Sequence, residues 1–240
     1  MYFETTYTID SRDLDCFDLC RPSALLGYLQ DAAGLAAGQF GATNVEMVRK
    51  YGHCWMVVRT GYTLDQPLHW GDQLRIKTWH RGGDKPLMFR DFMLEVDGRS
   101  VGQALSIWTL VNLTDHSMTR ADHFPEFTGT DGGELIRQTK LPKLKLPAEL
   151  APIQERLLHY SDTDGNGHVN NVRYADFLCD AAHLQTAPAG TFVKSLHIDY
   201  LRECKAGETL SLLGGQGDDG FYVQGRDSQG EVRFQGRMAL

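Results

Sequence analysis

The sequence predicts an α+β protein built from two similar halves, each consisting of a helix followed by antiparallel strands. The first observation is a weak internal repeat, because Arg12–Ala33 and Ser161–Ala182 align without gaps. The second is that apolar residues recur at helical spacing inside these segments and alternate in the segments that follow. The aligned pairs are Asp13 with Asp162, Asp15 with Asp164, Tyr28 with Phe177, and Asp31-Ala32-Ala33 with Asp180-Ala181-Ala182.

In each half an acidic turn leads into the predicted helix. The first helix ends at Gly41, since glycine readily adopts the left-handed conformation that closes helices. The second begins at Asn170 or Asn171, whose side chains are suited to capping a helix. The apolar stripes are Leu25, Leu29, Ala33, Ala36 and Phe40 in the first helix, and Val172, Ala175, Phe177, Leu178 and Ala182 in the second.

Strands separated by short turns follow each helix, and their pattern predicts hairpins. In the first half they are His53–Leu64, Gln73–His80, Met88–Val96 and Ser100–Asn112. In the second half they are Phe192–Leu201, Thr209–Gly214, Phe221–Asp227 and Glu231–Leu240. We expect residues 1–126 and 149–240 to be the two repeats, with residues 127–148 as a linker or an extra edge strand.

Composition excludes several classes of protein. The 240 residues carry a net charge of −7, which disfavours nucleic acid as a partner. No apolar run approaches the length of a membrane-spanning helix, and the first residues resemble no targeting segment, so we expect a cytoplasmic, bacterial protein. The five cysteines are odd in number and scattered, which indicates free thiols and no metal site.

The segment SDTDGNGHVNNVRY, residues 161–174, is the strongest candidate for chemistry. Asp164, Asn166 and His168 alternate with two glycines, which allow the backbone to bend and draw the three side chains together. Two other interpretations stay open. The segment tracks a calcium-binding EF-hand loop, although Arg173 occupies the position of the bidentate Glu. An Asx-rich turn that caps a helix would also have this composition.

The segment DTDGNGHVNNVRY, followed downstream by DYLRECKAGE, resembles the acyl-acyl-carrier-protein thioesterases of plastids and bacteria. The runs WMVVRTGYTLDQPLHWGDQLRIKTW and SIWTLVNLTDHSMTRA resemble the N-terminal repeat of that family, so the resemblance covers nearly the whole chain. It implies a tandem double hotdog, in which each repeat wraps an antiparallel sheet around a long helix. It also implies hydrolysis of fatty acyl thioesters on acyl carrier protein (ACP), with no cofactor.

Carried over position by position, the resemblance assigns catalysis to Asp164, Asn166, His168 and Glu203. The residue types fit, because thioester hydrolysis needs an activated water or a carboxylate nucleophile. Glu203 would activate water with His168, and Asn166 would hold the water, the nucleophile or Glu203. Asp164 is open as nucleophile, base or orienting group. Backbone N–H groups near Asn170 and Asn171 would stabilise the oxyanion.

The first repeat has Phe17 and Leu19 where the second has Asn166 and His168, so it lacks this chemistry. We expect it to wall an acyl pocket instead. The candidate lining residues are Trp55, Met56 and Leu29. Because ACP is acidic and the chain is itself negative, docking requires a local cationic face. Its candidates are Arg173, Lys194, Arg202 and Lys205.

Competing functions remain. Cys204 is a second candidate nucleophile, but on a strand it would face away from Glu203, so only one of the two would enter the site. An acyl-CoA thioesterase or a thioester dehydratase would use the same residue types. A non-catalytic acyl-binding or calcium-responsive module is the alternative outside enzymes. Both a monomer and a homodimer are compatible with a tandem repeat.

Overall fold

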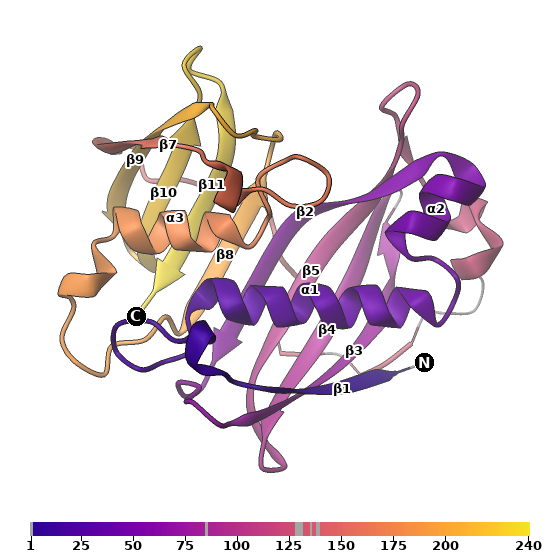
Figure 1. Cartoon of the computed structure of the whole chain (residues 1–240), viewed down its shortest axis with the longest axis horizontal. Helices are drawn as coiled ribbons and strands as arrows, with labels where there is room; N and C mark the ends of the chain where they lie inside the picture. Colours follow the sequence, from indigo (N-terminus) through magenta and orange to yellow (C-terminus); the bar gives the residue numbers. More distant parts are fainter. Residues whose placement is uncertain (1, 85, 128–131, 135, 138–139) are drawn as a thin grey trace.

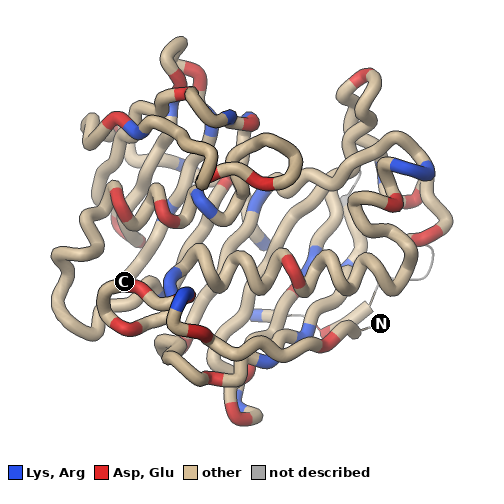
Figure 2. The backbone as a smooth tube through the Cα atoms, in the orientation of Figure 1, with Lys and Arg blue, Asp and Glu red and all other residues tan. Residues whose placement is uncertain are grey.

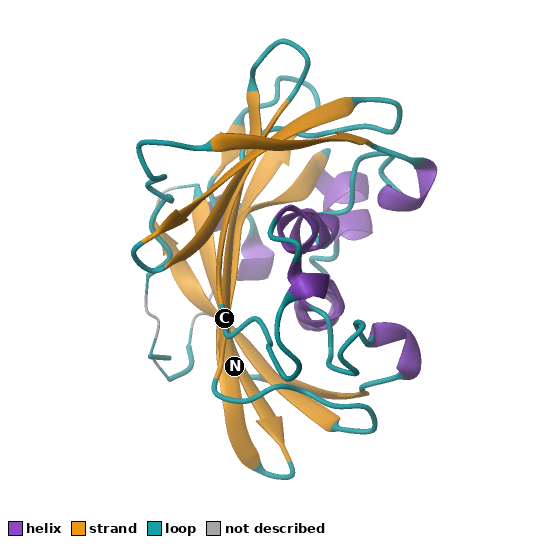
Figure 3. Ribbon diagram, turned by 90° about the vertical axis from the view of Figure 1, so that its left-hand side faces the viewer, coloured by secondary structure: helices purple, strands orange, loops and turns teal. Residues whose placement is uncertain are grey.

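One antiparallel sheet curves around the helices, which all lie on its concave side (Figures 1 and 3). The computed structural model describes residues 2–84, 86–127, 132–134, 136–137 and 140–240. The sheet has eleven strands in the order β1-β3-β4-β5-β2-β8-β11-β10-β9-β7, with β6 paired to β5. The strands are β1 Phe3–Thr8, β2 His53–Leu64, β3 Gln73–Asp84, β4 Leu87–Val96, β5 Arg99–Asn112, β6 Met118–Thr119, β7 Ala151–Leu157, β8 Ser195–Tyr200, β9 Thr209–Gly217, β10 Gly220–Arg226 and β11 Val232–Ala239.

Three α-helices cover this sheet: α1 Pro22–Gly38, α2 Asn44–Tyr51 and α3 Arg173–Ala181. Proline at the first turn of α1 suits a helix start, and the alanine- and leucine-rich sequence that follows favours helix. The short helix α2 is closed at both ends, by a Thr43–Glu46 capping box and by Gly52 in the left-handed conformation. Within the described residues, no helix is both long and apolar enough to cross a bilayer.

The two halves join where β2 pairs with β8, in a register that places Arg59 opposite Asp199. Asp199 is 1% exposed, and its carboxylate lies 3.4 Å from Arg59 Nε and 3.0 Å from His197 Nε2. The Leu144 N–H also donates to it (2.8 Å), so the segment between the halves is fixed to the junction. Three donors therefore compensate a carboxylate that would be costly to bury alone.

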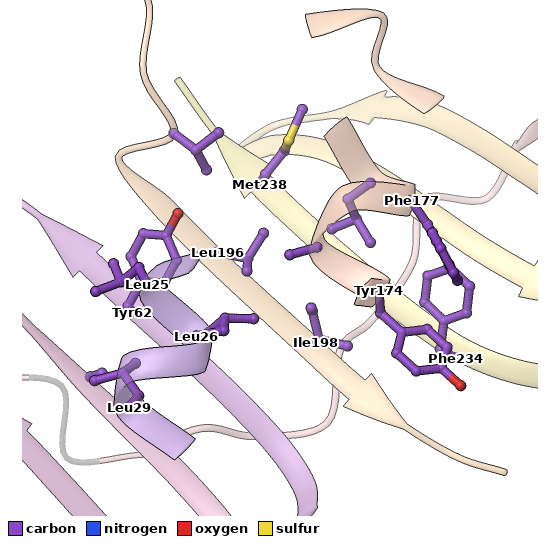
Figure 4. Packing of buried hydrophobic residues seen from close by; sticks show 14 of the residues in the cluster. Leu25, Leu26, Leu29, Tyr62, Tyr174, Phe177, Leu196, Ile198, Phe234 and Met238 are labelled. Carbon is purple, nitrogen blue, oxygen red and sulfur yellow. The ribbon is translucent and has the colours of Figure 1, made fainter. Parts of the chain in front are cut away.

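The core is continuous across this junction. Figure 4 shows Leu25, Leu26 and Leu29 of α1 and Tyr174 and Phe177 of α3 gathered over Leu196 and Ile198 of β8. In α3 the Phe177 ring lies 5.4 Å from the Tyr174 ring and 6.2 Å from the Phe234 ring, centroid to centroid. A shared core of this kind couples the stability of the two halves.

The structure confirms an α+β arrangement with a large antiparallel sheet and corrects several element boundaries. The helix expected to run to Gly41 ends at Gly38, and Gly41 lies in the following turn with φ 67°. The second helix begins at Arg173, and Asn170 Oδ1 caps the Val172 N–H (3.2 Å). The last strand before Glu203 ends at Tyr200. Strands β1 and β7 and helix α2 were not anticipated, because short or edge elements carry little periodicity.

We predict that Phe177→Ala costs about 3–5 kcal/mol of unfolding free energy, because Phe177 is 0% exposed and its removal leaves a cavity. The matched control is Tyr160→Ala, since Tyr160 is 90% exposed and its loss should change stability by less than about 0.5 kcal/mol. Denaturant titration followed by circular dichroism measures both values. Equal unfolding midpoints for the two variants would contradict the packing described above.

Candidate active site

The acidic turn before α3 is a tight chain reversal. Asp164 N–H donates to the His168 carbonyl (2.9 Å), and Gly167 N–H donates to the Asp164 carbonyl (3.0 Å). Gly167 has φ 76°, the left-handed region that glycine adopts without steric cost. Asp164 Oδ1 accepts from the Asn166 N–H (2.8 Å), which is an Asx turn. The reversal brings Asp164, Asn166 and His168, which an extended chain would separate, to one cavity.

The first half contains the same turn. Asp15 N–H donates to the Leu19 carbonyl (2.8 Å), and Asp15 Oδ1 accepts from the Phe17 N–H (2.8 Å). Asp18 occupies the left-handed position, with φ 59°. The hydrogen bonds therefore support the aligned repeat, and they show that the carboxylate at this position has a structural role even where the neighbouring side chains are apolar.

One backbone hydrogen bond joins the two segments that carry the candidate catalytic residues. Val169 N–H donates to the Cys204 carbonyl (2.8 Å). This bond brings together the residues that precede the two partners, His168 and Glu203. His168 Nε2 lies 3.1 Å from Glu203 Oε2. Their side chains are 30% and 47% exposed, so the pair is accessible. An imidazole and a carboxylate at this distance can share a proton.

Arg233 of β11 holds the backbone of Glu203. Its Nη1 donates to the Glu203 carbonyl (2.8 Å), while its Nε donates to Asp227 Oδ2 (2.8 Å). Burial alone would raise the pKa of Asp227, but hydrogen bonds from two backbone N–H groups and the guanidinium lower it below its usual range. A charged Asp227 therefore fixes Arg233, and Arg233 fixes the loop that presents Glu203.

The four candidate residues open into a cavity of about 780 Å³ whose other walls come mainly from the first half. Trp55 is central to these walls, with its ring 6.4 Å from Trp108 and 5.5 Å from Phe127, centroid to centroid. The side chains that make the cavity apolar include Phe40, Trp55, Met56, Met88, Trp108 and Phe127. A polar pair at the mouth of an apolar cavity suits a ligand with one reactive end and one hydrocarbon end.

Trp55 and Met56 line the cavity as expected, but Leu29 does not. Leu29 is 3% exposed and packs in the main core, because its place on α1 faces the junction of the two halves.

The expected oxyanion donors also need correction. Asn170 N–H already donates to the Asp162 carbonyl (2.8 Å), whereas Asn171 lines the cavity and its N–H makes no hydrogen bond with the described residues. Asn171 alone is placed to serve.

Cys204 is not placed to act as a nucleophile. It is 0% exposed, it lies in the main core, and burial raises the pKa of its thiol. A nucleophilic cysteine needs the opposite, an accessible thiol with a lowered pKa. Glu203 and Cys204 do face opposite ways, as expected, although they lie in the loop after β8 rather than on the strand.

The expected cationic residues surround the site unevenly. Arg202 lines the cavity, its side chain is 59% exposed, and its Nη2 lies 3.5 Å from Glu231. Arg173 instead contacts Asp176 (3.1 Å) and the Ser161 carbonyl (3.3 Å). Lys194 and Lys205 are exposed, but Lys194 precedes β8 and so lies at the opposite end of that strand from Glu203. Figure 2 shows acidic and basic residues interspersed over both halves, so attraction for an acidic partner has to be local.

Sequence reasoning missed several residues at the site. Tyr174 and Tyr200 line the cavity, and Tyr200 OH donates to the Asn171 carbonyl (3.1 Å). Tyr174 is the last residue of the segment 161–174 and could have been predicted to lie at the site from its place there. Nothing in the sequence connects Arg233 with Glu203. Among the described residues, no group of three or more His, Cys, Asp or Glu side chains is arranged to hold a metal ion.

Solved structures with the same fold support this description. An acyl-ACP thioesterase from Bacteroides thetaiotaomicron superposes with a TM-score of 0.83 at 19% identity, covering 99% of this chain and 96% of its own. The 12:0-ACP thioesterase from Umbellularia californica superposes with a TM-score of 0.82 at 21% identity and the same coverage. These likenesses show that the fold is shared.

Sequence comparison goes further. The profile of the acyl-ACP thioesterase N-terminal domain matches residues 1–123, and the profile of its C-terminal domain matches residues 150–235. The chain therefore belongs to the acyl-ACP thioesterase family. A chloroplastic palmitoyl-acyl carrier protein thioesterase of Gossypium hirsutum is 27% identical over 228 residues, covering 89% of this chain and 54% of its own. This chain thus spans about half the length of such curated relatives.

We predict that Arg233→Met lowers kcat for any reaction that Glu203 catalyses at this site on the order of 10- to 100-fold, because the loop that presents Glu203 loses its anchor. KM should change little, since Arg233 does not line the cavity. The matched control is Arg237→Met, because Arg237 lies on the same strand and pairs with Asp219 instead. Steady-state kinetics measures these values, and equal losses in both variants would refute a positioning role for Arg233.

Proposed function

We propose that this protein hydrolyses the thioester of fatty acyl-ACP and releases a free fatty acid and ACP with its thiol restored. The observation that carries the proposal is the His168–Glu203 pair at the mouth of an apolar cavity. The names of its relatives agree, since they include palmitoyl-acyl carrier protein thioesterase and dodecanoyl-[acyl-carrier-protein] hydrolase. The pair supplies proton transfer, and the cavity supplies a place for the hydrocarbon chain.

The architecture we propose for this activity is a tandem double hotdog. Residues 1–126 form the acyl-binding repeat, and residues 149–240 form the repeat with the catalytic set. Residues 127–148 are assigned to the link between them, of which 128–131, 135, 138 and 139 lie outside the described residues. The repeated acidic turn and the order helix then antiparallel strands in each half support this division. The first repeat has the turn without the polar side chains, and other residues of this repeat provide most of the cavity walls.

Water is the proposed nucleophile. Glu203 accepts a proton from the water as its oxygen attacks the thioester carbon, and His168, 3.1 Å away, shares that proton. Asn166 orients the water from the turn. Asp164 is less suited to attack the thioester, because its Oδ1 already accepts a hydrogen bond from the Asn166 N–H. Asp15 accepts the equivalent bond from the Phe17 N–H in the first half, which lacks the catalytic side chains. We therefore propose that Asp164 holds the turn together and contributes its negative charge to the site.

The oxyanion that forms on the carbonyl needs a donor fixed in advance. The Asn171 N–H is the proposed donor, since it opens toward the cavity just before α3 and the positive end of a helix dipole favours negative charge there. When the carbon–sulfur bond breaks, the leaving sulfur takes the proton that His168 carries. The two products are then a carboxylic acid and a thiol, and the water is consumed.

The central experiment measures thiol release from palmitoyl-ACP, palmitoyl-CoA and a 3-hydroxyacyl-ACP in parallel. We expect hydrolysis of the acyl-ACP, and we expect Glu203→Gln to lower kcat by about 10²-fold or more, because the base is lost while the shape is kept. Faster turnover of acyl-CoA would favour the acyl-CoA thioesterase. Loss of water from the hydroxyacyl substrate would favour a dehydratase, and acyl binding without turnover would favour a non-catalytic module.

The two turns provide a matched control for this experiment. Asp15→Asn and Asp164→Asn both retain an oxygen that can accept the Asx hydrogen bond, so stability should be similar in the two variants. Only Asp164→Asn should lower turnover, since only that turn lines the cavity. Equal activity losses would mean that the turns act structurally in both halves and that the Asp164 charge has no part in catalysis.

The docking face for ACP is proposed at Arg202, with Arg173 and Lys205 on neighbouring segments, whereas Lys194 precedes β8 and lies at the far end of that strand. Arg202→Glu should raise KM for acyl-ACP about tenfold and leave KM for a short acyl-pantetheine unchanged, because only the carrier protein is acidic. Raising salt above about 0.15 M should weaken the effect, since the Debye length there is about 8 Å. Kinetics with both substrates checks this, and the same change for both would place the docking face elsewhere.

A further inference from the structure

Arg90 is a partly buried cation in the wall of the acyl cavity, and the described residues give it no acidic partner. It lies on β4 and lines the same cavity as His168 and Glu203. Among the described residues its guanidinium makes one hydrogen bond, from Nη1 to Thr78 Oγ1 at 3.3 Å, and no carboxylate there forms an ion pair with it. Burial lowers the pKa of Arg90 to about 10, so the guanidinium stays charged at neutral pH.

Two other partly buried arginines of this protein, Arg59 and Arg233, do have such partners. Arg59 meets Asp199 at 3.4 Å, and Arg233 meets Asp227 at 2.7 Å. These pairs follow the general rule that buried charges are compensated by an opposite charge. Arg90 departs from this rule at the place where a ligand would lie, which indicates that the missing acceptor comes from the ligand.

The polarity of the cavity is not limited to Arg90. The Tyr7 hydroxyl and Gln30 Oε1 are buried, belong to residues that line the same cavity, and have no hydrogen-bond partner among the described residues. A plain hydrocarbon chain would exclude water from these groups and give them nothing in return. A chain that carries oxygen would restore at least the hydrogen bonds of the guanidinium, which has five N–H donors.

We propose that Arg90 forms a polar subsite for acyl chains that carry a hydrogen-bond-accepting oxygen, a hydroxyl or a carboxylate, far from the thioester. Resting on the proposed function, this inference names the substrate class of that site as oxygenated acyl chains. The selectivity of this subsite comes from the unpaired N–H donors of Arg90. A site built to hydrogen-bond an oxygen strongly rejects a chain without that oxygen, whereas an apolar site only weakly rejects a chain that carries one.

The sheet order gives the approximate position of this oxygen. Glu203 follows β8, and β4 lies three strands further along the order β8-β2-β5-β4. At ~4.8 Å per strand, Arg90 lies roughly 14 Å across the sheet from β8, the strand that leads to Glu203. An extended chain advances ~1.2 Å per bond, judged from ~3.6 Å for the three backbone bonds of a residue. The oxygen is therefore expected about ten to twelve bonds from the thioester carbon.

The test measures binding without turnover, so that failure of hydrolysis and failure of this subsite remain distinguishable. The probes are pantetheine amides, in which nitrogen replaces the thioester sulfur, carrying dodecanoyl, 12-hydroxydodecanoyl or 11-carboxyundecanoyl chains. Quenching of tryptophan fluorescence reports occupancy, because Trp55 and Trp108 line the cavity. We expect the wild type to bind at least one oxygenated probe about tenfold more tightly than dodecanoyl. Preference for the carboxylate would identify charge pairing, and preference for the hydroxyl would identify a neutral acceptor.

Arg90→Met should abolish this preference and tighten binding of the dodecanoyl probe, while Arg99→Met, a change at an exposed arginine on β5, should leave the preference intact. If Arg90→Met does not fold, Arg90→Gln removes the charge and should lose the advantage of the carboxylate probe. The inference is overturned if the wild type binds dodecanoyl as tightly as both oxygenated probes. It is also overturned if the preference survives removal of the Arg90 charge.

Discussion

The pairing of β2 with β8 is the constraint on which the arrangement of the site depends. It turns two sheets into one, and it directs the chain that leaves β8 along the end of β2 where the first half forms its cavity. Glu203 therefore reaches walls that belong to the other half of the sequence. The Asp199 carboxylate, buried at this junction with Arg59, His197 and the Leu144 N–H, makes the pairing specific, since any other register would leave it uncompensated.

A second constraint is local and is used twice. The Asp15 and Asp164 turns make the same Asx and backbone hydrogen bonds, and their reversals place two side chains on the concave side of the sheet. In the first half these are Phe17 and Leu19, and in the second they are Asn166 and His168. The turn therefore forms whichever side chains stand at these two positions, because backbone atoms and one carboxylate oxygen hold it together. The same turn therefore packs Phe17 against the core in the first half and presents Asn166 and His168 to the cavity in the second.

Charge is treated differently on the two faces of the sheet. On the side away from the helices, Asp199 is compensated by several donors, whereas Asp91, 0% exposed beside Arg81 at 3.3 Å, has its pKa raised by burial to about 6. On the concave side, Arg90 lines the cavity and no carboxylate of the described residues forms an ion pair with it. Each buried carboxylate of the first face lies beside an arginine, whereas Arg90 leaves a donor for the proposed ligand.

The sequence by itself determined the α+β class and most strand positions, because periodicity is a local property. The resemblance of its motifs to the acyl-ACP thioesterases named the four residues that line the cavity. The sequence also separated Glu203 from Cys204. Only the tertiary structure decided that Leu29 packs in the core, that the Asn170 N–H is already bonded to Asp162, and that Arg233 holds Glu203. These facts depend on contacts between residues distant in the chain. No local pattern encodes which face of a helix meets a cavity, or which arginine reaches a given carbonyl.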